Sequence, residues 1–188
     1  MVAAFDVMFD WGGSDNSPGT STDVDALGPP CIRFKVADDA TIDSSDPIPI
    51  PAEGTGYSYW KHIYLKCSTA PSVQVDNVEF YTDGGGFGTG ITLNVGDETP
   101  THNSGDTTGY DVADAAEIMT EHTDITGVTD AFTYTSGSAK AVSISESGSV
   151  IDAENETTDY IVLQLAVASN ATQGNLTDEI LTFSYDEI

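Results

Sequence analysis

Hydrophobic and polar residues alternate in short segments of this chain, and turn residues separate these segments. Such a period of two is typical of β-strands, because successive side chains of a strand point to opposite faces. The pattern predicts strands at 4–11, 30–39, 57–68, 73–83, 90–97, 130–136, 140–147, 157–169 and 179–188. We therefore expect an all-β protein, an antiparallel, jelly-roll-like β-sandwich of about eight to ten strands.

Three segments refine this expectation. Residues 160–169 form the most apolar run, which predicts a central strand buried on both faces. Proline alternates in the first part of 47–58, and proline cannot donate to a strand ladder, so this segment is expected at an edge or in a loop. Only 112–125 has helical periodicity, which allows at most one short helix.

The length of 188 residues fits a single domain over 1–188. Both chain ends carry apolar alternation, although chain ends otherwise tend to fray. Residues 1–11 are therefore expected either in the chain's own sheet or as an arm shared with a neighbouring subunit. The candidate residues for contacts between subunits are Phe5, Val7, Phe9, Trp11, Phe183 and Tyr185.

The glycine cluster at 84–90 lies between two predicted strands. A dinucleotide-binding fingerprint requires a helix after its glycines, and a phosphate-binding P-loop requires a lysine, and neither follows here. The cluster is thus expected to form a hairpin connection, with Gly85 and Gly86 at positive φ.

The charge of the chain is extremely acidic: 5 Lys and Arg oppose 31 Asp and Glu, a formal net charge of −26. Such a surface repels nucleic acid and anionic membranes, so neither is an expected partner. Adaptation to a halophilic or marine medium is the favoured explanation, because salt screens the repulsion. The alternative is binding of Ca²⁺ by acidic loops.

Four aspartates are weak candidates for such a Ca²⁺ site. Asp83 and Asp97 lie at the two ends of the predicted glycine hairpin, and Asp23 and Asp25 are close in sequence. Loop aspartates more often cap turns through the backbone, and this interpretation is favoured here. No cofactor is therefore expected.

Catalytic motifs are not recognisable in the chain. The 3 histidines do not occur in a nucleophile or zinc-protease pattern, and no catalytic residue is assigned. Cys31 and Cys67 lack the spacing of a zinc site. Two buried thiols are slightly favoured over one disulfide, and that choice stays open.

Aromatic residues gather between positions 57 and 81. They could line a face that binds a glycan, for example on a host surface, but most are expected in the core or in cross-strand pairs. These residues are Tyr57, Tyr59, Trp60, Tyr64, Phe80 and Tyr81.

One resemblance covers most of the chain. The stretches "IRFKVADDATIDSSDPIPIPAEGTGYSYWKHIYLKCSTAP", "VDNVEFYTDGGGFGTGITLNVGD" and "TFSYDEI" resemble a group of small uncharacterised proteins of tailed viruses and proviruses of bacteria and archaea. The resemblance implies a non-enzymatic virion protein that is made in the host cytoplasm. Its expected partners are copies of itself and other virion proteins such as a major capsid protein.

The acidic surface favours a place on the capsid exterior, as decoration or turret, because the capsid lining faces DNA. Symmetric homo-oligomers are expected in that role. The alternative is an extracellular carbohydrate-binding module or a cell-surface or filament subunit with the same β-sandwich.

Overall fold

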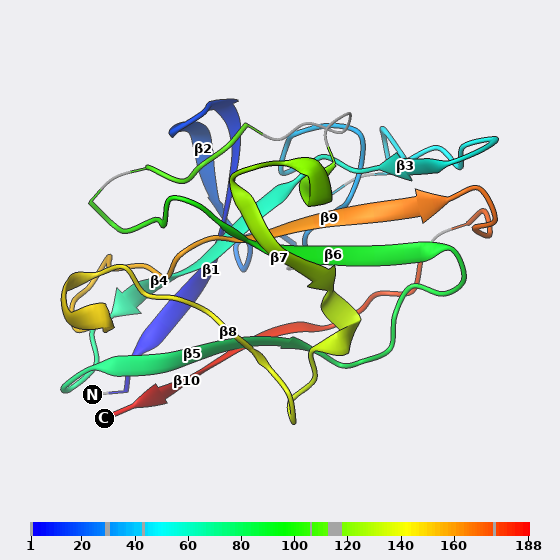
Figure 1. Ribbon diagram of the computed structural model, residues 1–188. Coiled ribbons are helices and arrows are strands. Elements are labelled where there is room, and N and C mark those ends of the chain that lie inside the picture. Colours follow the sequence, from blue (N-terminus) through cyan, green and yellow to red (C-terminus); the bar gives the residue numbers. More distant parts are fainter. Residues whose placement is uncertain (1, 29–30, 43, 106, 113–117, 175) are drawn as a thin grey trace.

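The computed structural model describes residues 2–28, 31–42, 44–105, 107–112, 118–174 and 176–188, which form two antiparallel β-sheets (Figure 1). The large sheet has the order β2-β1-β4-β9-β6-β7, with β3 also paired to β9, and the small sheet has the order β10-β5-β8. The protein is thus an all-β sandwich, as the alternation predicts. The strands are β1 (Ala4–Ser14), β2 (Ser17–Asp23), β3 (Thr55–Tyr57), β4 (Lys61–Thr69), β5 (Val75–Thr82), β6 (Ile91–Glu98), β7 (Ile125–Asp130), β8 (Lys140–Ala141), β9 (Ile161–Ala168) and β10 (Leu181–Glu187).

The main apolar core lies between the two sheets. Ile63 and Leu65 of β4 and Leu163 of β9 pack in one cluster with Val78 and Phe80 of β5, and all five are buried. Burial of each such side chain contributes on the order of 1.5–3 kcal/mol. The prediction of a central strand at 160–169 is confirmed, because β9 is paired with β3, β4 and β6 and is mostly buried.

The described helical elements are short. They are the 3₁₀ turns η1 (Met119–Glu121), η2 (Ala131–Thr133) and η3 (Ser147–Ser149). The segment 112–125, for which the sequence allowed at most one short helix, contains the turn η1 in its described part, while His122 is extended, β7 begins at Ile125, and 113–117 lie outside the described residues. No helix in the described chain is long and apolar enough to span a membrane.

Three predicted strands are wrong or too long. Residues 31–39 are irregular and form no strand. Lys35 occupies a polar position of the predicted alternation, but its side chain is buried and its Nζ lies 2.7 Å from Oδ1 of Asp39. At 130–136 the Asp130 side chain accepts a hydrogen bond from Phe132 N, which favours the turn η2 over a strand. The strand predicted over 140–147 is limited to β8.

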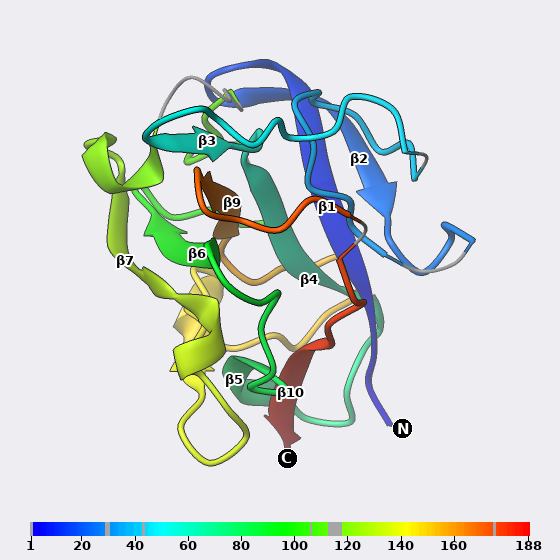
Figure 2. The same ribbon diagram turned by 90° about the vertical axis from the view of Figure 1, so that its right-hand side faces the viewer.

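The glycine cluster is not a hairpin. It leads from β5 in the small sheet to β6 in the large sheet, so it crosses between the two layers (Figure 2). Gly86 has a positive φ of 98°, as expected, but Gly85 is not among the positive-φ residues. A Cβ on Gly85 would instead lie 2.6 Å from Oε2 of Glu179.

The N-terminal strand belongs to the chain's own sheet. β1 pairs with β2 on one edge and with β4 on the other, and Phe9 is only 2 % exposed. The chain's own sheet thus uses most of the backbone groups that an arm would offer to a neighbour, which favours the first of the two expectations for residues 1–11.

Deletion of residues 1–11 is therefore expected to unfold the protein rather than to yield a folded monomer. It removes most of β1 from between two strands and exposes the apolar faces that β1 covers. Circular dichroism and thermal unfolding of the truncated chain measure the effect. A cooperative unfolding transition near that of the full chain would contradict it.

Candidate functional site

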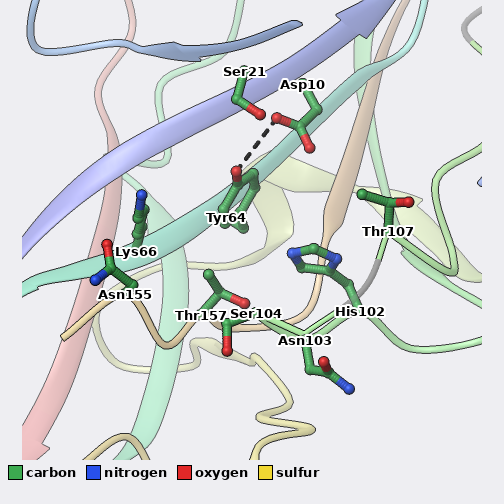
Figure 3. A pocket seen from close by; sticks show the side chains of 10 residues that line it. All are labelled: Asp10, Ser21, Tyr64, Lys66, His102, Asn103, Ser104, Thr107, Asn155 and Thr157. Atoms are coloured by element: carbon green, nitrogen blue, oxygen red, sulfur yellow. Dashed lines mark hydrogen bonds between the residues drawn. The ribbon is translucent and has the colours of Figure 1, made fainter. Parts of the chain in front are cut away.

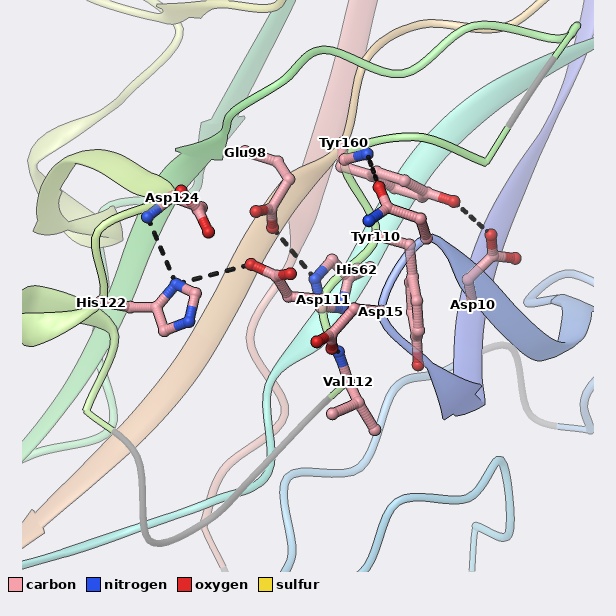
Figure 4. Close-up of polar contacts among 12 residues, drawn as sticks. Asp10, Asp15, His62, Glu98, Tyr110, Asp111, Val112, His122, Asp124 and Tyr160 are labelled. Carbon is pink, nitrogen blue, oxygen red and sulfur yellow. Dashed lines mark hydrogen bonds and ion pairs between the residues drawn. The ribbon is translucent and has the colours of Figure 1, made fainter.

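The outer face of the large sheet carries a layer of buried polar and aromatic side chains, which we call the polar layer. Along β4, His62 and Tyr64 point away from the core that holds Ile63 and Leu65, as the period of two requires. The segment after β6 contributes further side chains to this layer (Figure 4). The polar layer consists of Asp10, His62, Tyr64, Glu98, His102, Tyr110 and Tyr160, all of them buried.

Asp10 on β1 connects the aromatic part of the polar layer. Its carboxylate accepts hydrogen bonds from the hydroxyls of Tyr160 and Tyr64. The Tyr160 ring stacks on His102 with ring centres 4.2 Å apart. Burial, together with the charge of Asp10, raises the pKa of both tyrosines above the ordinary range, so they stay protonated and act as donors.

Glu98 and His62 form a buried pair, with 3.1 Å between Glu98 Oε2 and His62 Nε2. Burial lowers the pKa of His62 to about 4 and raises that of Glu98 to about 9. Both shifts favour the neutral forms, so the hydrogen bond joins two uncharged side chains. This arrangement avoids the cost of two buried charges.

Beside Glu98 lies a cluster of carboxylates and one imidazole. Asp111, His122 and Asp124 each offer a ligand atom, and these atoms lie within 4.8 Å of one another. Nδ1 of His122 is 3.5 Å from Oδ2 of Asp111 and 3.4 Å from the amide N of Asp124 (Figure 4). The sequence does not reveal this group, because Asp111 lies 11 positions before His122 and no metal-ligand motif joins them.

A polar pocket of about 220 Å³ opens next to the aromatic part of the polar layer (Figure 3). It is smaller than the roughly 300–1,000 Å³ typical of ligand sites, so it suits at most a small polar molecule or water. Its lining residues are Asp10, Ser21, Tyr64, Lys66, His102, Asn103, Ser104, Thr107, Asn155 and Thr157.

The four aspartates proposed for Ca²⁺ do not come together. Asp23 accepts a hydrogen bond from Asp25 N, and Asp83 accepts one from Gly85 N, as turn-capping residues do. Asp97 forms an ion pair with Lys140 at 2.6 Å. In the part of the chain that the structure describes, the group with metal-ligand spacing contains none of these four.

The aromatic residues of 57–81 do not form an exposed platform. Trp60 and Phe80 are fully buried and Tyr64 is 6 % exposed, while the other three are half-buried. The core interpretation therefore describes them better than a glycan-binding face. Cys31 and Cys67 are free thiols, the first half-buried and the second buried.

Of the six candidate contact residues, Phe9 lies in the core of the chain and is 2 % exposed. The other five are half-buried and pack against the same core. Phe5 and Tyr185 lie together with ring centres 4.8 Å apart. Phe183 packs on Phe80 at 5.5 Å.

The two chain ends lie close together (Figure 1), and three exposed apolar residues gather at this end. Backbone hydrogen bonds join Ile188 to Gln74, which brings Ile188 next to Val73, and Ala3 N donates to Glu187, which brings Val2 to the same end. Val2, Val73 and Ile188 are 78 %, 59 % and 62 % exposed. We call these three residues the terminal patch.

Comparisons of the chain with models of protein families, with curated proteins and with solved structures give no match.

Asp159, the residue before Tyr160 of the polar layer, is a buried carboxyl group whose shifted pKa makes the stability depend on pH. Its Oδ2 accepts a hydrogen bond from Ser145 Oγ at 3.1 Å, and burial raises its pKa from 3.8 to about 6. The folded chain thus binds more protons than the unfolded chain between these two values. The contribution of Asp159 to stability is therefore present at low pH and declines as the pH rises through this window.

The substitution Asp159→Asn is expected to remove that decline. The difference in the free energy of unfolding, variant minus native chain, should increase by about 1–2 kcal/mol from about pH 4 to about pH 7. Urea unfolding at several pH values measures it. The exposed Asp152→Asn serves as the control and should give a nearly constant difference, and equal slopes for both variants would contradict the burial effect.

Proposed function

We propose that this protein is a non-enzymatic structural subunit that assembles with copies of itself on the exterior of a virion. The terminal patch is the observation that carries the proposal, because three large aliphatic side chains are mostly exposed at one end of an otherwise strongly acidic chain. Exposed apolar side chains that gather in one place are typical of contact surfaces.

A second copy of the chain is the occupant that this surface favours. The patch is next to β10, which is paired only with β5 and is an edge strand of the small sheet. The Phe5–Tyr185 pair lies at the same end and is half-buried, so it can extend the apolar contact. Each copy carries a net charge of −26, so copies repel one another strongly. A stable contact between copies therefore needs a surface with few carboxylates, and salt should strengthen the contact because it screens the repulsion.

The non-enzymatic part of the proposal is supported by the burial of the reactive groups. His62 and Glu98 have shifted pKa values, which can mark a catalytic site. However, His62 is 0 % and Glu98 4 % exposed, and the pocket beside the polar layer is small and polar. Their shifts are explained by desolvation within a structural layer.

The virion location is supported by the resemblance to proteins of tailed viruses and by the acidic surface, which suits the capsid exterior. A major capsid protein is the proposed anchor. The alternative, a subunit of a cell surface or filament, uses the same self-assembly and differs in location. A glycan-binding role is less favoured, because the aromatic residues of 57–81 are buried or half-buried.

Self-assembly is expected to depend on the terminal patch. Sedimentation velocity over a range of protein and NaCl concentrations should show oligomers that increase with both. Val73→Asp and Ile188→Asp should shift the chain to monomer without loss of folding. The control is Ile180→Asp, which changes a side chain of similar exposure (65 %) at the other end of β10.

Oligomers that persist equally in the patch variants would place the contact elsewhere. A chain that is monomeric under all these conditions would contradict self-assembly by the isolated protein.

The location is tested on intact particles. An antibody raised against the folded chain is expected to label purified virions from a host that carries the gene, in immunogold electron microscopy. Labelling of uninfected host cells, with no labelling of particles, would favour the cell-surface alternative and contradict the virion location.

A further inference from the structure

We propose that Glu98, Asp111, His122 and Asp124 together bind one divalent transition-metal ion. This proposal is independent of self-assembly and of location. It places a metal at the edge of the polar layer, where the segments on both sides of η1 meet the end of β6.

The backbone brings these side chains together from three segments. Glu98, the last residue of β6, is paired with Ile125 of β7, so that the residue before Ile125 lies beside the residue after Glu98. The hydrogen bond from Thr99 N to Asp124 O, 2.7 Å, fixes this arrangement. The segment with His122 and Asp124 thus runs past the end of β6, and Asp111 reaches the same place from the segment after β6, beside the Glu98 carboxyl (Figure 4).

The ligand atoms are close to the spacing that a metal requires. Those of Asp111, His122 and Asp124 lie within 4.8 Å of one another, and Nδ1 of His122 is 3.5 Å from Oδ2 of Asp111. Bonds of about 2.0–2.2 Å around a tetrahedral ion place ligand atoms roughly 3.3–3.5 Å apart. Small rotations of side chains that are not fully buried can close the difference.

Glu98 provides an independent observation that points to a cation. Its side chain is 1 % exposed, and its Oε2 is held by His62. Its other oxygen, Oε1, is buried and accepts no hydrogen bond from a donor group of the described residues, and the further partner of this side chain is the carboxyl of Asp111. Two carboxyl groups in contact can exchange the proton between them for a divalent cation that both oxygens bind.

Charge supports the same conclusion. Three carboxyl groups and one imidazole meet at this place. Figure 4 shows the carboxyl of Glu98 beside that of Asp111, with the His122 ring next to them. A bound divalent cation would neutralise this group and allow the carboxylates to remain close.

The ligand set favours a transition metal over Ca²⁺ or Mg²⁺. Ca²⁺ and Mg²⁺ prefer oxygen ligands throughout, whereas an imidazole nitrogen among carboxylates suits Zn²⁺ and related ions. His62 would then act as the outer partner that orients Glu98, since ligating carboxylates are commonly held by a hydrogen bond. The ion would connect the segment around Asp111 to the end of β6 and thereby stabilise the cover of the polar layer.

Zinc itself is the probe for the test. Calorimetry with the full chain, without a histidine tag, is expected to give saturable binding of one Zn²⁺ per chain. Zn²⁺ should also raise the melting temperature at constant ionic strength, while the same concentration of Ca²⁺ or Mg²⁺ should have a much smaller effect. Stronger stabilisation by Ca²⁺ than by Zn²⁺ would overturn the assignment.

Variants assign the binding to these residues. His122→Gln and Asp124→Asn are expected to fold and to lose both the saturable binding and the Zn²⁺-dependent shift in melting temperature. Asp83→Asn changes an exposed aspartate at a distant turn and should retain both. Absence of saturable Zn²⁺ binding by the native chain, or unchanged binding in His122→Gln and Asp124→Asn, would overturn the site.

Discussion

The pairing of β4 with β9 is the interaction on which the rest of the structure depends. Both strands lie inside the large sheet and are buried on both faces. One face of the pair needs an apolar partner, which the small sheet supplies through Val78 and Phe80. The other face carries His62 and Tyr64, so its cover must supply hydrogen bonds and aromatic contacts as well as apolar area.

The polar layer meets that requirement with few net charges. Tyr160 and Tyr64 donate to Asp10, and Glu98 is hydrogen-bonded to His62. A chain with a net charge of −26 thus keeps most of its carboxylates at the surface and neutralises or pairs those that it buries. The terminal patch exposes apolar side chains and the cluster around His122 brings carboxyl groups together, and these two features support the proposals made for them.

Near the ends of strands, the local sequence predicted the structure less well than it did in the strand centres. The glycine cluster was predicted as a hairpin because alternating segments flank it, but a hairpin and a connection between sheets share the same turn residues. The choice between them depends on which strand β5 meets, and β5 pairs with β8 and β10. Likewise, β2 lacks apolar alternation, and it is a strand because it pairs with the edge of β1.

The alternation determined the all-β class, and the apolar run at 160–169 determined the central position of β9, because a short strand with apolar residues on both faces fits the middle of a covered sheet. Only the tertiary structure decided which polar side chains meet. Asp10 and Tyr160 are 150 positions apart, and Glu98 and His62 are 36 apart. Spacing along the chain carries no signal for such pairs, since strand order and register bring them together, and these depend on the packing of the whole sandwich.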